Sequence, residues 1–209
     1  GKAYRGRTVI VASGKRSRQL NIPGESEYAG RGVSYCATCD GPFFKGQPVL
    51  VAGGGNSAMQ AALELAEICP SVQLVSLTKL TGDEILRSKV EADDRIGKHL
   101  LWQPVEIRGN GKEVQLVIIA SVNGDERREL EVSGVFIEIG LYPNSSFVVD
   151  LLQLNSNGEI VVDCEGRTGV KGVFAAGDVT QVRDKQIVVA AGEGAKAALS
   201  AHDYLLSGR

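Results

Sequence analysis

Residues Pro48–Ala58 read PVLVAGGGNSA, and this stretch decides the fold of the chain. Its first five residues form a short apolar run typical of a buried strand, and an Ala- and Leu-rich helical pattern over residues 56–68 follows the glycines. Residues 72–77 (VQLVSL) form a second apolar run. A strand, a glycine turn, a helix and a strand within about thirty residues predict a βαβ unit, and hence a parallel sheet.

The glycine turn matches G-x-G-x-x-A, a pattern of dinucleotide-binding βαβ units. Gly53 permits the tight turn, Gly55 lets the backbone approach a pyrophosphate, and Ala58 lets the helix pack on the strand. Asn56 and Ser57 open the helix, where unpaired N–H groups favour an anion. We therefore expect these five residues to bind a dinucleotide.

Further elements lie on both sides of this unit. The pattern predicts a buried strand over residues 8–12, a helix over 83–101, an antiparallel meander of strands over 105–107, 114–120, 129–132 and 135–139, short strands over 160–162 and 173–175, and a last helix over 186–206. The chain is therefore expected to be an α/β protein.

Composition excludes several classes of partner. The chain has 23 basic and 25 acidic residues, a net charge of −2, and no Lys/Arg cluster. It therefore lacks the electrostatic footprint for nucleic acid or an anionic membrane. No apolar run approaches the ~20 residues of a membrane span, and the N-terminus lacks the pattern of a signal peptide, so we expect a cytoplasmic protein.

The stretch SYCATCDGPF, residues 34–43, brings Cys36 and Cys39 close together. Zinc would need two more ligands at suitable spacing, yet the other two cysteines and both histidines are isolated in sequence, so no metal site is expected. A disulfide closing so short a loop would add little stability. Thiol–disulfide exchange is the interpretation that remains.

Two carboxylates accompany these motifs. Asp40 follows Cys39 directly and suits an acid–base group that moves protons on and off the thiols, although a plain turn residue is the alternative. Asp178 ends the apolar run GVFAAGD, residues 172–178, which places a carboxylate at the carboxyl edge of a parallel sheet, where ligands bind. A simple Gly-Asp turn explains this second pattern equally well.

The motifs CATCDG, GGGNSA, GVFAAGD and KQIVVAAGEGAKAALSAHDYL resemble, in order and spacing, the low-molecular-weight thioredoxin reductases and the related alkyl hydroperoxide reductase flavoproteins. The resemblance runs from about Thr8 to the end of the chain. It implies a Rossmann-like nicotinamide-nucleotide domain with the redox pair (32–142), inserted into a partial FAD-binding α/β domain (1–31 and 143–209).

The resemblance also implies roles for individual residues. Cys39 would be the thiol nearest the flavin, Cys36 the thiol that attacks a protein disulfide, and Asp40 the acid–base residue. The residues expected at the FAD site are Gly14, Gly177, Asp178, Lys185, Gln186 and Ile187. A thioredoxin-like or peroxiredoxin-system protein would be the partner, and a homodimer the assembly.

Two departures from the family pattern matter. The family's N-terminal βαβ, with its own G-x-G-x-x-G for the FAD pyrophosphate, does not occur in this sequence, and the chain begins with Gly1, so we expect it to be part of a longer polypeptide. The arginines that hold the 2′-phosphate of NADPH are also missing from residues 76–82, the end of the second strand. We therefore expect weak discrimination between NADPH and NADH, or a different electron donor.

These observations favour an FAD-dependent dithiol–disulfide oxidoreductase, in which electrons pass from a reduced nicotinamide nucleotide through FAD and Cys36–Cys39 to a thioredoxin-like protein disulfide. One alternative is a reductase that serves a peroxiredoxin system. Another is a non-catalytic remnant that binds a dinucleotide or a protein and has lost its use of flavin or nucleotide.

Overall fold

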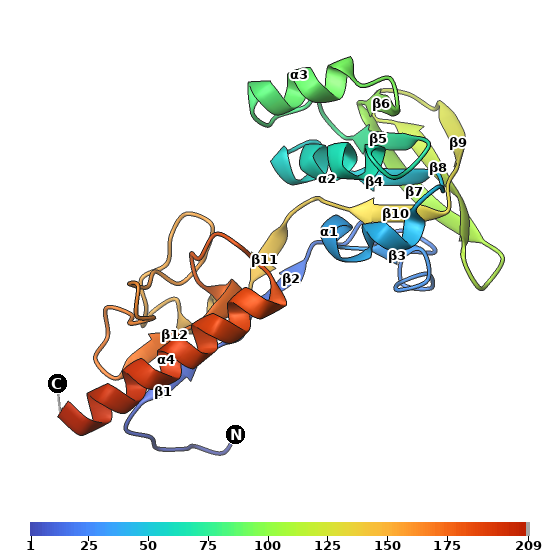
Figure 1. The fold of residues 1–209 in the computed structure, drawn as a ribbon. Coiled ribbons are helices and arrows are strands. Elements are labelled where there is room, and N and C mark those ends of the chain that lie inside the picture. The colour runs from blue at the N-terminus through green and yellow to red at the C-terminus, as the bar shows by residue number, and fades with distance from the viewer. Residues whose placement is uncertain (208–209) are drawn as a thin grey trace. The chain divides into compact units, whose positions relative to one another are not determined.

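The computed structural model describes residues 1–207, which form two compact units (Figure 1). Unit 1 comprises Gly1–Arg16 and Leu141–Arg209, and unit 2 comprises Ser17–Gly140. The chain passes from one unit to the other near β2 (Lys15–Ser17) and β11 (Leu141–Pro143). The predicted boundary after residue 31 thus falls inside unit 2, because Tyr28 joins the hydrophobic core of that unit.

Unit 2 is built on a five-stranded parallel sheet with the order β3-β10-β4-β5-β6. Its strands are β3 (Val33–Ser34), β4 (Val49–Ala52), β5 (Val72–Ser76), β6 (Ile96–Leu100) and β10 (Gly134–Ile137). The glycine turn, the helix α2 (Asn56–Ala66) and β5 follow β4 as predicted, so the βαβ unit and the parallel α/β fold are confirmed.

Both faces of this sheet are buried. Val49 and Val51 of β4 pack with α2 and α3 (Glu84–Ala92), while the alternate residues Leu50 and Ala52 pack on the other face. That second face is covered by an antiparallel sheet of β7 (Trp102–Gly109), β8 (Val114–Ser121) and β9 (Arg127–Glu131) (Figure 1). Burial on both sides explains why β4 reads as a continuous apolar run.

Two predictions about unit 2 were wrong. The predicted helix over 83–101 ends at Ala92, and Ile96–Leu100 forms the edge strand β6, because these residues pair with β5. The predicted fourth strand of the meander, 135–139, instead forms most of β10 and lies between β3 and β4 in the parallel sheet. Both outcomes depend on pairing partners far away in sequence.

Unit 1 contains a parallel pair, β1 (Val9–Val11) and β12 (Val173–Ala175), and the long helix α4 (Ile187–Ser207). Ala175 packs with Val11 in one cluster, whereas Phe174 and Ala176 face Ala197 and Ala201 of α4 in another. The predicted strand over 160–162 is reduced to isolated bridges of Ile160. Within residues 1–207, no helix is both long and apolar enough to cross a lipid bilayer.

The remaining short elements connect these layers. They are α1 (Ala37–Asp40) and the 3-10 turns η1 (Gly41–Phe44), η2 (Ser146–Val148) and η3 (Gly177–Val179). Of these, α1 carries Cys39 and has Cys36 as its N-cap, and η3 carries Asp178.

Candidate functional site

The glycine turn after β4 has the backbone that its pattern predicts. Gly53 has φ +144°, and a Cβ there would lie 2.4 Å from the carbonyl oxygen of Glu138 and 2.8 Å from the Cβ of Ala58. Only glycine fits this position without displacing backbone. Gly55 is the N-cap of α2, so the unpaired N–H groups of the helix begin at Asn56.

A cavity of about 920 Å³ opens beside this turn, entirely within unit 2. It is lined by residues 19–23, 52–57, 75–78, 81, 103–105 and 138–140. Gly53, Gly55, Asn56 and Ser57 of the predicted dinucleotide site line it, whereas Ala58 is buried beneath the turn. Among the described residues that line the cavity, Glu138 alone carries a charge.

The segment after β5 folds back onto the start of α2. Asn56 accepts a hydrogen bond from the backbone N–H of Asp83 at 2.7 Å and donates one to its carboxylate at 3.1 Å. Thr81 donates its backbone N–H to the carbonyl of Gly54 at 2.9 Å. These contacts fix the wall of the cavity at which β5 ends, where a dinucleotide of this fold places its ribose.

Cys36 and Cys39 are joined in a disulfide at the start of α1. Cys36 is the N-cap residue, and its Sγ accepts the backbone N–H of Cys39 at 3.2 Å. Cys36 is half-buried and Cys39 is exposed. The disulfide is therefore accessible to solvent. It lies just after β3, at the carboxyl edge of the parallel sheet. Within residues 1–207, no group of three or more His, Cys, Asp or Glu side chains could hold a metal ion.

Asp40, the predicted acid–base residue, is held by β3. Its Oδ2 accepts a hydrogen bond of 2.6 Å from the hydroxyl of Ser34. The Ser34 hydroxyl also accepts the backbone N–H of Cys36 at 3.1 Å. Ser34 is buried, so it links the carboxylate to the backbone of the disulfide in a fixed geometry.

Glu138 is a site residue that the sequence analysis missed. It follows β10 directly, and its Oε1 accepts the backbone N–H of Ala37, the first residue of α1, at 3.4 Å. Burial raises the pKa of Glu138; the Ala37 N–H opposes this shift, and the nearby charge of Glu64 adds to it. A single carboxylate at the end of the apolar run GVFIEIG is the sequence signal that could have revealed it.

In unit 1, the residues predicted for FAD lie at one edge of the β1–β12 pair. Gly14 follows β1, and Gly177 and Asp178 follow β12. Because the two strands are parallel, both loops leave the same edge, where ligands of such sheets bind. Gly14 and Gly177 have φ of +67° and +72°, so both loops use backbone conformations that side chains disfavour.

Lys185 belongs to a buried ion cluster at the same edge. Oε1 of Glu159 lies 2.5 Å from Nζ of Lys15 and 3.3 Å from Nζ of Lys185, and these three side chains are only 10%, 10% and 18% exposed. Burial and the charge of Lys15 lower the pKa of Lys185, and the carboxylates of Glu159 and Asp178 oppose this shift. Lys15 and Glu159 were not predicted from the sequence, because they are far apart in the chain.

Gln186 and Ile187 lie at the start of α4 and are exposed, Ile187 to 90%. The edge therefore offers a carboxylate, a lysine and an open apolar side chain beside two backbone loops. This set suits a ligand with hydroxyl groups and a flat ring, so the residues present fit a flavin.

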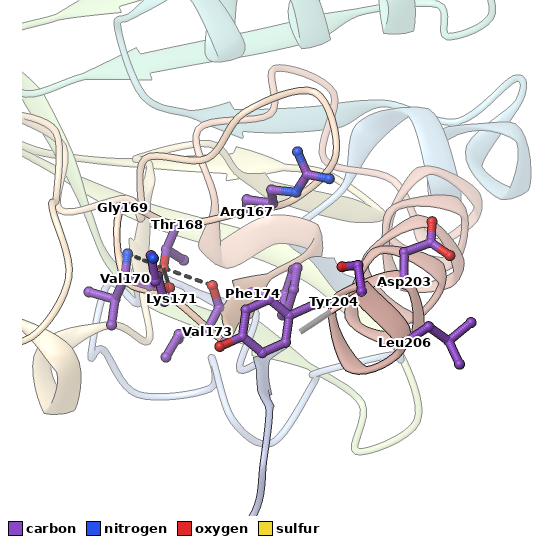
Figure 2. A pocket seen from close by; sticks show the side chains of 12 residues that line it. Arg167, Thr168, Gly169, Val170, Lys171, Val173, Phe174, Asp203, Tyr204 and Leu206 are labelled. Carbon is purple, nitrogen blue, oxygen red and sulfur yellow. Dashed lines mark hydrogen bonds between the residues drawn. The ribbon is translucent and has the colours of Figure 1, made fainter. Parts of the chain in front are cut away.

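A second cavity, about 740 Å³ in volume, lies in unit 1, between the start of β12 and the end of α4 (Figure 2). In its wall the rings of Tyr204 and Phe174 pack edge to face, with their centroids 6.2 Å apart. Thr168 donates a hydrogen bond of 2.8 Å to the carbonyl of Val173. None of the residues predicted for a site lies in it.

The fold and these sites define an α/β protein that carries an accessible disulfide beside a glycine-turn cavity. The sequence profile of the pyridine nucleotide-disulphide oxidoreductases matches residues 1–194. The chain therefore belongs to the pyridine nucleotide-disulphide oxidoreductase family.

Its relatives include an alkyl hydroperoxide reductase protein from Pseudomonas putida, which is 45% identical over 207 residues. That alignment covers 99% of this chain and 40% of the relative. The thioredoxin reductase of Streptococcus pyogenes MGAS5005 matches with a TM-score of 0.90 and 40% identity, over 96% of this chain and 66% of that one. The T. acidophilum thioredoxin reductase matches with a TM-score of 0.70 and 40% identity, over 97% and 67%.

Proposed function

We propose that this chain forms part of an FAD-dependent dithiol–disulfide oxidoreductase that passes electrons from a reduced nicotinamide nucleotide to a protein disulfide. The observation that carries the proposal is the Cys36–Cys39 disulfide, exposed at the start of α1 in the unit that also holds the glycine-turn cavity. Unit 2 is the proposed nucleotide domain, and unit 1 the proposed contribution to the FAD domain.

The residues of the chain have distinct tasks in this proposal. The start of α2 binds the pyrophosphate of the nucleotide through backbone N–H groups. Asp178, Lys185 and the loops at Gly14 and Gly177 hold FAD, which supplies two-electron transfer between nucleotide and disulfide when bound. Gln186 and Ile187 lie beside its ring.

The accessible disulfide at α1 supports thiol–disulfide exchange with a protein substrate. One thiolate attacks the substrate disulfide, and the other then breaks the mixed disulfide. Cys36 is assigned the attack and Cys39 the contact with the flavin by resemblance alone. Asp40, oriented by Ser34, moves protons on and off the thiols during this exchange.

Nucleotide preference is the finer part of the proposal. Leu77 and Thr78 follow β5 at the cavity wall, and no arginine is among the described residues that line the cavity. A 2′-phosphate would therefore lack the bidentate partner that makes its recognition strong. We propose similar use of NADH and NADPH.

The partner has two candidates. Similarity to thioredoxin reductases favours a thioredoxin-like protein, and the 45% identity to a protein named for alkyl hydroperoxide reductase favours a peroxiredoxin-system protein. A homodimer, which rests on the resemblance, and a cytoplasmic location, which rests on the sequence expectation, complete the proposal.

The test is anaerobic reduction of the FAD-supplemented protein by NADH and by NADPH, with labelling of the new thiols at Cys36 and Cys39. We expect both nucleotides to reduce the disulfide, Cys39→Ser to abolish transfer to a protein disulfide, and the matched control Cys164→Ser to retain it. No reduction by either nucleotide would contradict the proposal. A hundredfold preference for NADPH, about 2.7 kcal/mol, would contradict the nucleotide assignment.

A further inference from the structure

The order of the parallel sheet brings Glu138 between two sites that are distant in sequence. β10 pairs with β3 on one side and with β4 on the other. The chain that leaves β3 forms the disulfide, and the chain that leaves β4 forms the glycine turn. The residue that follows β10 therefore stands between them, at the carboxyl edge of all three strands.

The backbone of Glu138 is fixed to the nucleotide side of this junction. Its N–H donates to the carbonyl of Ala52 at 2.8 Å, extending the β10–β4 ladder by one residue. Its own carbonyl lies so close to Gly53 that a Cβ there would approach it to 2.4 Å. The start of the Glu138 side chain is thus set by the same turn that lines the cavity.

The side chain reaches the redox side. Its carboxylate accepts the N–H of Ala37, the residue directly after Cys36. In a four-residue helix this N–H has no partner within the helix, so Glu138 satisfies a free backbone donor directly beside Cys36. Glu138 is also among the residues that line the cavity.

Reduction adds a negative charge close to the carboxylate of Glu138. Reduction of the disulfide with two electrons and one proton leaves one thiol and one thiolate. The Sγ of Cys36 accepts the N–H of Cys39, and the carboxylate of Glu138 accepts the N–H of Ala37, so a Cys36 thiolate and an ionised Glu138 would both lie at the backbone donors of the first turn of α1. Two anions that share one set of donors each disfavour the charged form of the other.

We propose that Glu138 is a positioning residue that sets the reduction equilibrium of the Cys36–Cys39 disulfide and makes it sensitive to what occupies the cavity. The proposal rests on the proposed function. An anionic nucleotide in the cavity disfavours the ionised carboxylate, which weakens the competitor of the thiolate and favours the dithiol. By reciprocity, reduction of the disulfide then tightens nucleotide binding by the same factor.

Glutathione redox buffers test this without flavin. Two glutathione thiols become one glutathione disulfide as the Cys36–Cys39 bond breaks, and mass spectrometry of trapped thiols gives the equilibrium constant for that peptide. Glu138→Gln keeps the acceptor oxygen and removes the charge. Glu64→Gln is the matched control, because Glu64 also contacts α1, accepting the Thr38 hydroxyl at 3.2 Å, but is exposed and does not line the cavity.

We expect Glu138→Gln to shift the equilibrium toward the dithiol about tenfold, or about 30 mV toward a less negative potential. Glu64→Gln should shift it less than twofold. Equal shifts in the two variants would overturn the proposal, since any loss of charge near α1 would then act alike. Unchanged circular dichroism of both variants separates this effect from unfolding.

The second arm adds saturating NAD⁺ to the same buffers. The wild-type equilibrium should move toward the dithiol several-fold, and the Glu138→Gln equilibrium should not move. An equal response of both proteins would overturn the link to the cavity. Failure of the wild-type protein to bind NAD⁺ in a direct titration would instead contradict the proposed function, and the comparison without nucleotide would still decide the role of Glu138.

Discussion

Replacement of Glu159 by Gln should destabilise unit 1 by removing the shared partner of two buried lysines. Lys15 and Lys185 both form ion pairs with Oε1 of Glu159, and the side-chain amide of Asn155 donates a hydrogen bond to its Oε2 at 2.7 Å. Burial alone would raise the pKa of Glu159, but the hydrogen bonds from Lys15 and Asn155 and the two lysine charges outweigh it and lower the pKa to about 2.

The magnitude follows from this pKa. A displacement from the ordinary 4.5 to about 2 corresponds to about 3 kcal/mol of stabilisation at ~1.36 kcal/mol per unit. Independently of this pKa, removal of one partner from a buried ion pair generally costs about 3–5 kcal/mol, because the other charge stays buried and unpaired. We therefore expect Glu159→Gln to lower the free energy of unfolding of unit 1 by about 3 kcal/mol near pH 7.

The sign of the pH dependence is fixed. Because the folded pKa is depressed, the stabilisation is fully present above the ordinary pKa of 4.5 and is lost as the pH falls toward 2. The difference between wild type and Glu159→Gln should thus be constant from pH 7 to about pH 5 and nearly vanish near pH 2.

Native-state hydrogen exchange measures this in unit 1 alone. The amides of Ala175 and Ala176 bond to the carbonyls of Gly166 and Val11 in the core of that unit, so they exchange through its opening. We expect exchange more than a hundredfold faster in Glu159→Gln at pH 7. Glu193→Gln breaks the partly exposed ion pair with Lys196, and it should change the free energy of opening measured at these amides by less than about 1 kcal/mol. Equal exchange of wild type and Glu159→Gln would refute the reasoning.

Two further predictions concern unit 2. Gly53→Ala, with φ +144° and a Cβ 2.4 Å from the Glu138 carbonyl, should lower the free energy of unfolding, followed by tryptophan fluorescence in urea, by at least the ~1–3 kcal/mol of a strained backbone. Gly55→Ala, with open space around its Cβ, should cost no more than the ~1 kcal/mol of an N-cap change and should mainly weaken NADH binding. Ser34→Ala removes the hydrogen bond that orients Asp40. Reaction of the reduced protein with a small disulfide should therefore slow about tenfold in stopped-flow absorbance, less than the ~10²–10⁴ contribution of a full acid–base group, because Asp40 itself is retained. An unchanged rate would remove Asp40 from the proton transfer.

The local features of the fold were predictable from sequence, and the non-local ones were not. The run 48–58 predicted β4, the turn and α2 because strand, glycine and helix signals lie next to one another. The edge strand β6 was mistaken for helix, because its alternate residues are only partly buried and the apolar pattern is weak. Strand β10 was assigned to the wrong sheet, since its own sequence does not indicate that it pairs with β3 and β4.

The same distinction separates the site residues that sequence found from those it missed. Cys36, Cys39 and Gly53 stand in patterns whose spacing is itself the signal. Glu138 and Glu159 gain their roles from contacts 101 and 144 residues away, to Ala37 and Lys15. Within its own segment each is a single carboxylate beside apolar residues, a pattern that many surface positions share.

The charge of the cavity constrains how unit 2 could bind a nucleotide. With Glu138 as the only charged residue among those described in its lining, attraction for phosphate must come from backbone N–H groups and the dipole of α2. These act on the pyrophosphate, which NADH and NADPH share, and they fall off within the first turn of the helix. The 2′-phosphate of NADPH would add charge at the β5 end of the cavity, near Leu77 and Thr78, where no cation is among the described lining residues. The proposed similar use of the two nucleotides thus follows from where the positive potential lies, and Thr78→Arg should create a preference for NADPH.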